Sequence, residues 1–415
     1  MKIIVLGSGL LGVTTAYELG RRGHEVTVLD RQAVSGAETS FANGGQLSYS
    51  HSEPWANPGS LKKLPKWLLD PEAPLVFRLR ADWQMITWGL QFLRNCTTSR
   101  AEVNGVNILR LGLYSKRKMT EIREQTNIAF DFAKGGILHL FGKDTDYEYA
   151  KGLYAFQGKF GDVHNILSRD ECYALEPALA HTQRTIVGGI HTVNDEYGDA
   201  YLYCNELAKV ATERHGVKFQ YGVDIQKLRA QQGKITAVVT DKGEFNADSY
   251  VMAMGSYSPI PLREHGINLP IYPMKGYSIT IPTNEYCPAI SLTDGTYKVV
   301  YSRLGNRLRV AGTAEFAGHN TDINEKRITP IVKAARSLLP KAGWDQDISK
   351  WACLRPSTPD GPPIIGKTKI PNLYLNTGHG TLGWTQAAGS SAIVCDIIEA
   401  KTPEIILHGL TIERY

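Results

Sequence analysis

Three glycines near the start of the chain carry the clearest chemical signal. Gly7, Gly9 and Gly12 form the pattern G-x-G-x-x-G directly after the strand-like residues 3–6. In this pattern the first glycine makes a tight turn, the second admits a pyrophosphate to the backbone, and the third lets a helix pack on the strand. The N–H groups at the start of that helix then face the phosphates. The pattern therefore predicts a dinucleotide site, with an ordinary glycine-rich turn as the alternative.

An acidic residue follows at the distance that such a site requires. The apolar residues 26–29 lead into Asp30, which lies about 20 residues beyond the glycines. A carboxylate at this position accepts hydrogen bonds from ribose hydroxyls. Strand, turn, helix and strand thus occur in order, and this context makes the glycine pattern far more specific than it would be alone.

A second glycine pattern lies near the other end of the chain. Gly378, Gly380 and Gly383 repeat G-x-G-x-x-G after an expected strand at 373–376 and before an expected helix at 385–400. Too few residues follow it for another nucleotide-binding unit. The start of this helix would instead face an anion or a carbonyl group, which suits the negative charge that a reduced flavin carries near its N1 and C2 carbonyl. A turn that only permits close packing is the alternative.

The elements that must position these loops follow from the hydrophobic pattern. Its periodicity predicts helices at 82–95, 101–127, 200–215 and 323–340, and strands at 217–225, 235–240 and 248–255. Residues 270–315 alternate between polar and apolar, as in an antiparallel sheet. The two glycine loops lie far apart in sequence, so the dinucleotide-binding part is discontinuous. We expect an α/β fold in which an antiparallel sheet is inserted into a Rossmann-like domain, with α+β character in the inserted part.

Composition narrows the class of protein. The 415 residues, 42% hydrophobic and 21% charged, are typical of a soluble chain with two domains. The net charge of +5 is spread along the chain, so we expect no nucleic acid partner but a weak attraction to anionic membrane surfaces. No run of about 18 apolar residues occurs, hence no membrane span is expected. Six cysteines without a C-x-x-C pattern indicate neither a metal site nor a disulfide framework, and favour a reducing compartment.

An aromatic stretch precedes the long expected helix. Residues 51–75 are rich in proline, tryptophan and lysine and favour a loop or broken helices. The expected helix at 82–95 carries an aromatic stripe, which in the simpler interpretation packs against the second domain. In the other interpretation the stripe joins Trp55 and Trp67 in a membrane-facing patch across 55–95.

Five segments, spread over the whole chain, carry a family resemblance. They are residues 3–30, Glu-Thr-Ser-Phe-Ala-Asn-Gly-Gly-Gln at 38–46, Pro-Met-Lys-Gly-Tyr-Ser at 273–278, Leu-Arg-Pro-Ser-Thr-Pro-Asp-Gly-Pro-Pro-Ile-Ile-Gly at 354–366, and Asn-Thr-Gly-His-Gly-Thr-Leu-Gly-Trp-Thr at 376–385. With them the chain resembles the D-amino acid oxidase/glycine oxidase superfamily of FAD enzymes, and within it the D-amino acid dehydrogenase small-subunit type. We therefore expect an FAD-binding domain of the glutathione-reductase type at 1–50, 185–260 and 345–415. The inserted substrate or cap domain is expected at 51–184 and 261–344.

The resemblance assigns residues to each part of FAD. The pyrophosphate would be surrounded by Gly7, Gly9, Leu10, Leu11, Gly12, Met254, Gly255 and Ser256. The adenosine would contact Asp30, Arg31 and the backbone of Val223. The loop beside the flavin ring would comprise Ser40, Ala42, Asn43, Gly44 and Gln46. The pyrimidine edge of the ring would face Gly378, Gly380, Thr381, Leu382, Gly383, Trp384 and Thr385. No metal is implied.

The substrate residues also follow from the resemblance. Arg355 matches the family arginine that holds the substrate carboxylate beside the flavin. A guanidinium fork suits this role because it pairs with a carboxylate through two parallel hydrogen bonds. A structural ion pair is the alternative for this arginine. Tyr277 and Tyr301 would line the pocket and bind the substrate, and His379 would lie next to the flavin, with His51 as a weaker candidate.

The activity that the resemblance implies is FAD-dependent oxidative deamination of D-amino acids. The Cα hydrogen would pass as hydride to flavin N5, and the imino acid would be hydrolysed to a keto acid and ammonia. No protein base is assigned, because an amine that arrives unprotonated needs none. The electrons would go to a quinone, a partner protein or another acceptor than oxygen, and the chain would be cytoplasmic, on the inner face of the inner membrane.

Several alternatives stay open. A pocket of another size would make the chain a D-hydroxyproline or D-proline dehydrogenase, or a glycine/sarcosine-type oxidase. Without turnover of its own, the chain would be an FAD-containing electron-transfer subunit of a larger complex, and an oligomer is also compatible with the sequence. Cys353 would carry a covalent flavin, as a cysteine at matching spacing does in the related monomeric sarcosine oxidases, or remain a small buried thiol.

Overall fold

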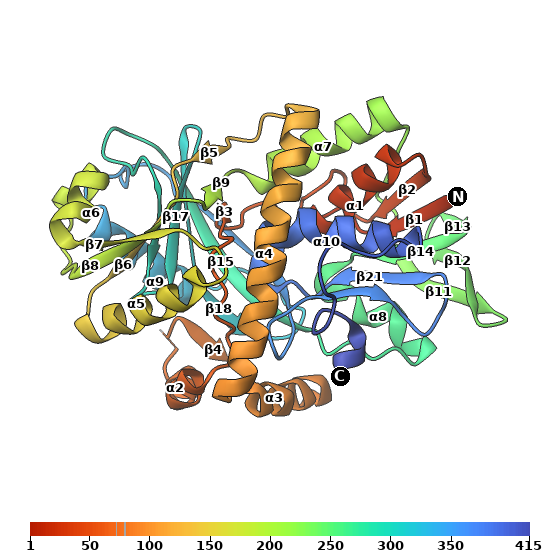
Figure 1. The fold of residues 1–415 in the computed structure, drawn as a ribbon, viewed down its shortest axis with the longest axis horizontal. Helices are drawn as coiled ribbons and strands as arrows, with labels where there is room; N and C mark the ends of the chain where they lie inside the picture. Colours follow the sequence, from red (N-terminus) through yellow and green to blue (C-terminus); the bar gives the residue numbers. More distant parts are fainter. Residues whose placement is uncertain (72, 79) are drawn as a thin grey trace.

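Two large β-sheets lie at opposite ends of the molecule, and the long helix α4 (Thr98–Thr126) crosses between them (Figure 1). This computed structural model describes residues 1–71, 73–78 and 80–415. One sheet has six strands and the other has nine. The mixed α/β architecture expected from the sequence is confirmed.

The six-stranded sheet joins the start of the chain to its end. Its order is β10 (Lys218–Tyr221), β2 (Glu25–Asp30), β1 (Lys2–Leu6), β14 (Ser249–Met252), β21 (Leu373–Thr377) and β20 (Ile364–Lys367). All neighbours are parallel except β20, which runs antiparallel to β21. The discontinuous, Rossmann-like arrangement predicted from the two glycine loops is therefore confirmed.

Both faces of this sheet are covered, which explains why its central strands are mainly apolar. On one face Ile3 and Val5 pack in a core with helices α1 (Leu10–Arg21), α7 (Ala200–His215) and α10 (Gly383–Ile398). On the other face Ile4 and Leu6 pack against the small sheet of β11 (Ile225–Gln231), β12 (Lys234–Thr240) and β13 (Gly243–Phe245). Helix α4 packs on α10 and extends the first core.

The nine-stranded sheet is built mainly from the middle of the chain. Its order is β19 (Ser349–Ser357), β15 (Tyr272–Pro282), β18 (Arg307–Phe316), β17 (Val299–Leu304), β16 (Ser291–Asp294), β6 (Ile137–Phe141), β8 (Gly188–Thr192) and β7 (His164–Ser168), with β4 (Leu75–Phe77) paired to β18. Most pairs are antiparallel, but β16 with β6 and β18 with β4 are parallel. The antiparallel sheet expected at 270–315 is confirmed, and the parallel pairs are formed by β4 and β6, which come from earlier parts of the chain.

The remaining elements connect and cover these sheets. Helix α9 (Glu325–Leu338) packs on β15 and β18, and helices α5 (Asp144–Gly158) and α6 (Arg169–Leu175) pack on β7 and β8. Helices α2 (Pro58–Leu69) and α3 (Trp83–Asn95) lie near one end of α4 (Figure 1), and α2 forms where the sequence favours a loop or broken helices. The shorter elements are α8 (Pro259–Leu262), β3 (Gln46–Leu47), β5 (Ala133–Lys134) and β9 (Glu196–Tyr197).

The predicted helices can be compared directly with the structure, whereas the predicted domain division cannot. The helices predicted at 82–95, 101–127, 200–215 and 323–340 are confirmed as α3, α4, α7 and α9. Hydrogen bonds place β8 and β19 in the nine-stranded sheet, although the predicted division assigns 185–260 and 345–415 to the FAD-binding part. The predicted domain division stays a prediction. Among the described residues, no helix combines the length and the apolar character needed to cross a membrane.

Candidate active site

A cavity of about 430 Å³ lies where the six-stranded sheet meets β19, the outermost strand of the nine-stranded sheet. The carboxyl ends of β1, β14 and β21 open into it, which is where ligands bind in open α/β sheets. Its walls include most of the residues that the sequence singles out, namely Gly7, Gly9, Leu10, Leu11, Asp30, Arg31, Ser40, Ala42, Asn43, Val223, Met254, Gly255, Ser256, Tyr277, Cys353, Arg355, His379, Gly380, Thr381, Gly383 and Trp384. The fold thus brings together segments that lie far apart in the chain.

The first glycine loop has the geometry that its pattern predicts. Gly7 has φ +101°, and a side chain there would place Cβ 2.7 Å from the carbonyl oxygen of Ala253. At Gly12 a Cβ would lie 1.8 Å from the carbonyl oxygen of Gly7, so only glycine lets α1 pack this closely on the turn. Asp30 closes the loop from β2, since its Oδ2 accepts a hydrogen bond of 2.6 Å from the N–H of Ser8. These contacts direct the start of α1 at the cavity.

The cavity wall presents bare backbone where phosphates and carbonyl groups would approach. Gly255 and Gly380 have φ values of +54° and +53°, and no further heavy atom lies within 4 Å of the place that a Cβ would take. Helices α1 and α10 both start at the cavity, and neither Gly9 nor Leu382 caps its helix with a side-chain hydrogen bond. Helix starts of this kind bind anions through their N–H groups. Together they fit a long, negatively charged dinucleotide such as FAD.

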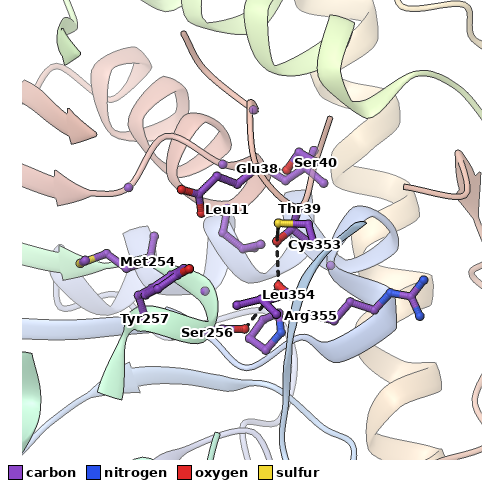
Figure 2. Close-up of a pocket in the computed structure, with 18 of the residues that line it drawn as sticks. Leu11, Glu38, Thr39, Ser40, Met254, Ser256, Tyr257, Cys353, Leu354 and Arg355 are labelled. Carbon is purple, nitrogen blue, oxygen red and sulfur yellow. Dashed lines mark hydrogen bonds between the residues drawn. The ribbon is translucent and has the colours of Figure 1, made fainter. Parts of the chain in front are cut away.

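The loop after β2 is tied to β19 in the wall of the cavity (Figure 2). Thr39 Oγ1 donates a hydrogen bond of 2.7 Å to the carbonyl oxygen of Leu354 and lies 3.5 Å from Cys353 Sγ. Ser256, which follows β14, donates to the same carbonyl oxygen at 3.3 Å. Burial raises the pKa of the Cys353 thiol, so its nucleophilic thiolate is disfavoured at neutral pH.

Arg31 and Val223 mark the end of the cavity where the sequence expects adenosine. The guanidinium of Arg31 pairs with Glu38 at 2.6 Å and lies over the ring of Tyr257, 4.0 Å from the ring centre. The backbone N–H of Val223 donates to the carbonyl oxygen of Asp30 at 2.9 Å. Both residues are therefore held in place by the structure before any ligand binds.

Arg355 lines the cavity from β19, and its side chain points away from Thr39, Cys353 and Leu354 (Figure 2). Its guanidinium lies over Gly276, where a Cβ would come within 2.5 Å of Cζ, so the missing side chain makes room for it. No residue that the structure describes forms a hydrogen bond or an ion pair with this guanidinium. Burial lowers the pKa of Arg355 to about 10, which leaves it charged at neutral pH. A half-buried, charged fork without a protein partner suits the carboxylate of a ligand.

His379 lies between this large cavity and a smaller one. Its ring is buried, with Nε2 3.1 Å from Ser390 Oγ and with Nδ1 unpaired within the described part of the chain. Burial lowers the pKa of His379 to about 3, so the ring is neutral. The smaller cavity measures about 30 Å³ and is lined by His51, Leu382 and aromatic side chains of α3.

The two tyrosines expected in the substrate pocket belong to the other face of their sheet. Tyr301 lies outside the cavity, in the core beneath α9. Tyr277 touches the cavity wall, but its hydroxyl donates a 2.5 Å hydrogen bond to Glu315. Strand alternation explains this, because odd positions of β15 face the core whereas even positions such as Gly276 face the cavity. This corrects the prediction for Tyr301 and leaves Tyr277 without a free hydroxyl for a substrate.

Some residues expected beside the flavin connect neighbouring segments instead. The side-chain amide of Gln46 donates to Ser291 Oγ at 2.9 Å, which ties it to the nine-stranded sheet. Thr385 Oγ1 accepts a hydrogen bond of 3.0 Å from the N–H of Ser48. Neither side chain lines the large cavity. Three of the glycines predicted to contact FAD also do not line this cavity, namely Gly12, Gly44 and Gly378.

Two aromatic residues line the large cavity although no motif points to them. Trp351 lies on the same face of β19 as Cys353 and Arg355, so strand alternation alone would have placed it. Tyr257 lies in a short turn after β14, where the guanidinium of Arg31 packs over its ring, and no sequence pattern predicts this contact.

Comparison with known proteins defines the class to which this site belongs. A family model described as FAD dependent oxidoreductase, DAO, matches residues 2–397. The chain therefore belongs to this family of FAD-dependent oxidoreductases, and FAD is its cofactor. The resemblance carried by the five sequence segments is confirmed.

Similar proteins narrow the class further. The whole chain is 46% identical to a D-amino acid dehydrogenase of Paramagnetospirillum magneticum, of which it covers 99%, and 44% identical to one of Granulibacter bethesdensis, of which it covers 100%. Two solved structures share the fold at lower identity. They are glycine oxidase from Bacillus cereus (21% identity, TM-score 0.75, 97% of this chain and 95% of that chain) and L-amino acid deaminase from Proteus myxofaciens (16% identity, TM-score 0.77, 100% and 93%).

Proposed function

We propose that this protein oxidises D-amino acids to imino acids and binds the substrate carboxylate on Arg355. The observation that carries the proposal is the half-buried guanidinium of Arg355, which is charged, lines the cavity of an FAD enzyme and has no partner among the described residues. The relatives of 46% and 44% identity, which match the whole chain and are described as D-amino acid dehydrogenases, support this substrate class.

Each part of the cavity has a separate role in this proposal. Arg355 pairs with the carboxylate through two parallel hydrogen bonds and so orients the Cα atom. The start of α10 presents backbone N–H groups that stabilise negative charge next to it. His379 stays neutral and adds no charge of its own. Bound FAD supplies the oxidant, which accepts two electrons from the substrate Cα–H bond.

Besides the amino acid, the proposed reaction needs only water and an acceptor for the two electrons. The amino acid loses two electrons and two protons and becomes an imino acid, which water converts to a keto acid and ammonia. No described side chain is assigned as the general base, because the reacting amine is the unprotonated form. The two electrons leave for an acceptor, for which we propose a quinone.

The decisive experiment is an anaerobic titration of the FAD-loaded protein with D- and L-amino acids. We expect a D-amino acid to bleach the flavin absorbance and its L-enantiomer to leave the absorbance unchanged. Bleaching only by D-proline, D-hydroxyproline or N-methylglycine would select the other substrate classes. A yellow protein that no amino acid bleaches would contradict the proposal and favour an electron-transfer subunit.

We also propose that the outer surface of α2 and α3 contacts an anionic membrane, from which the quinone reaches the enzyme. Leu69, Trp83 and Leu90 are 82%, 75% and 62% exposed. Apolar side chains of this size stabilise interfacial binding when they leave water. Basic residues next to them attract anionic lipid, and α2 exposes Lys62, Lys63 and Lys66.

This surface is smaller than the aromatic stretch suggests. Trp67 and Trp88 are buried in the core beneath α2 and α3, so they take no part in it. Trp55 is half-buried against the same core. Residues 72 and 79, which fall within the expected range 55–95, lie outside the described residues. The membrane contact proposed here therefore rests on the exposed side chains of α2 and α3.

A further inference from the structure

We propose that the smaller cavity beside His379 receives the side chain of the substrate, and that Met274 and Trp88 limit the size of that side chain. The inference rests on the proposed function, because it needs a substrate whose carboxylate pairs with Arg355. It extends that function by assigning the residues that choose among amino acids.

The smaller cavity lies within one amino acid's reach of Arg355. Ser357, on its wall, comes two residues after Arg355 on the same face of β19, which corresponds to about 7 Å along a strand. Met274, another wall residue, is the cross-strand partner of Arg355 on β15. The loop at 379–381 lines both cavities. A carboxylate held by Arg355 therefore leaves the substituent on Cα next to the smaller cavity.

The wall of the smaller cavity is mainly hydrocarbon. Most of its surface comes from buried apolar side chains, among them Trp88, Phe92, Met274 and Phe316. The indole N–H of Trp88 already donates to the carbonyl oxygen of Ser357 at 2.9 Å. Glu53, at one end, accepts a 3.0 Å hydrogen bond from Tyr149. Burial lowers the pKa of His51, which favours its neutral form. An uncharged, apolar side chain therefore suits this cavity best.

The volume of the smaller cavity restricts the length of that side chain. One water-sized group needs roughly 10–15 Å³. The cavity of about 30 Å³ thus holds a methyl or ethyl group but not a longer chain. Its aromatic walls are closely packed, since the ring of Trp88 stacks on Phe92 with centres 5.3 Å apart and packs on Phe316 at 4.7 Å. Packed aromatic side chains yield only at a cost, so longer substrates are disfavoured.

The test compares D-amino acids of increasing chain length in the FAD-loaded protein. Wild type and Met274→Ala are mixed anaerobically with D-alanine, D-2-aminobutyrate and D-norleucine, and flavin bleaching gives the rate and the apparent Kd. In wild type we expect the efficiency to fall at least about tenfold from D-alanine to D-norleucine. Met274→Ala removes the wall beyond Cβ, so D-norleucine should gain at least about tenfold relative to D-alanine.

Two further variants keep this test decisive. Met85 lies in the same hydrophobic core but lines neither cavity, so Met85→Ala should cost similar stability and leave the chain-length ratio unchanged. Ala56 does line the smaller cavity, so Ala56→Val should narrow it and penalise D-2-aminobutyrate. The inference is overturned if the ratio stays constant in both Met274→Ala and Ala56→Val, or if Met85→Ala changes it as much as Met274→Ala.

A binding experiment separates failure of this inference from failure of the proposed function. Propionate, butyrate and hexanoate carry the carboxylate but no reacting amine, and their binding perturbs the flavin absorbance without turnover. A preference for the short carboxylates that Met274→Ala relaxes supports the cavity assignment even when no D-amino acid is oxidised. Equal affinity at every chain length in wild type overturns it, even when D-amino acids are oxidised.

Discussion

Arg355 places a positive charge at the wall of the large cavity, and the bare backbone of Gly276 makes room for it. Arg355→Lys keeps the charge but loses the two parallel hydrogen bonds, so we expect the Kd of propionate to rise about tenfold or more. Arg355→Met removes the charge as well and should raise that Kd about 100-fold. Both values come from titrations of the flavin absorbance, with the FAD content of each variant as a check.

Arg309 provides the matched control for this prediction. Burial lowers the pKa of Arg309 to about 10 as well, but its guanidinium donates to Thr280 Oγ1 at 2.7 Å and to the carbonyl oxygen of Asn43 at 3.2 Å. Arg309→Lys should therefore reduce stability and leave the Kd of propionate unchanged. An equal loss of affinity in Arg309→Lys and Arg355→Lys would contradict a direct contact between Arg355 and the carboxylate.

Cys353 should leave FAD bound without a covalent link. Burial raises the pKa of its thiol, so little reactive thiolate is present at neutral pH. We expect acid precipitation to release all of the flavin into the supernatant, from wild type and from Cys353→Ala alike. Flavin that stays with precipitated wild type but leaves Cys353→Ala would show that this prediction is wrong.

Single residues were predictable where a short motif dictates the local backbone. Gly7, Asp30 and Arg355 line the cavity because each is placed by its own strand end or strand face. Tyr301 was misplaced because the face of a strand that meets a ligand depends on the packing of the whole sheet. Alternation was a usable signal, since residues 276–281 place glycine, serine and threonine on one face and tyrosine and isoleucine on the other. The smaller cavity was not predictable, because no local pattern marks a void between distant segments.

At the scale of elements, the two helices that start at the large cavity are joined near their other ends. Arg22, just after α1, pairs with Glu18 at 3.0 Å and with Asp396 and Glu399 at the end of α10 at 2.6 Å and 2.9 Å. Arg22→Met leaves three carboxylates without their shared cation, so the free energy of unfolding should fall by about 3 kcal/mol. Urea denaturation measures this loss. In Lys401→Gln, which removes an exposed partner of Glu399, the loss should stay below about 1 kcal/mol.

The same network predicts how stability depends on acid. Burial raises the pKa of Glu399, but hydrogen bonds from Lys401, Arg22 and His24 outweigh this and hold the pKa at about 2, below the ordinary value of 4.5. Because the pKa is lower in the folded state, the stabilisation is present above about pH 4.5 and is lost as the pH falls toward 2. Glu399→Gln should remove this part of the pH dependence in urea denaturation. An acid dependence that Glu399→Gln leaves intact would assign it to other carboxylates.

Helices with a regular apolar period were predictable from the sequence, whereas the pairing of strands in the nine-stranded sheet was not. Helices α3, α4 and α7 carry continuous apolar stripes over several turns, so the sequence alone locates them. The parallel pairs of β6 with β16 and of β4 with β18 join segments far apart in the chain. Their direction depends on the path of the chain between them, which leaves no trace in the alternation of either strand.

For the whole molecule, the exposed surface of α2 and α3 should decide where the protein resides. We expect wild type to co-sediment with vesicles of phosphatidylglycerol, and the double variant Trp83→Glu/Leu90→Glu to bind at least about tenfold more weakly because it loses two apolar anchors. Ile406→Glu is the matched control, since Ile406 is 68% exposed but lies at the other end of the chain. Equal binding of the double variant and wild type would refute the membrane contact.

Helix α3 borders the smaller cavity on one face and the outer surface of the protein on the other. Trp88 and Phe92 form part of the wall of the smaller cavity, while Trp83 and Leu90 are exposed on the outer surface. A contact that shifts this helix from outside therefore also changes the cavity inside. Thermodynamic linkage makes the effect reciprocal. If contact with a surface raises the protein's affinity for substrate by some factor, then bound substrate raises the protein's affinity for that surface by the same factor. The supply of substrate would then set how much of the protein is held at that surface, with no regulator other than the substrate itself.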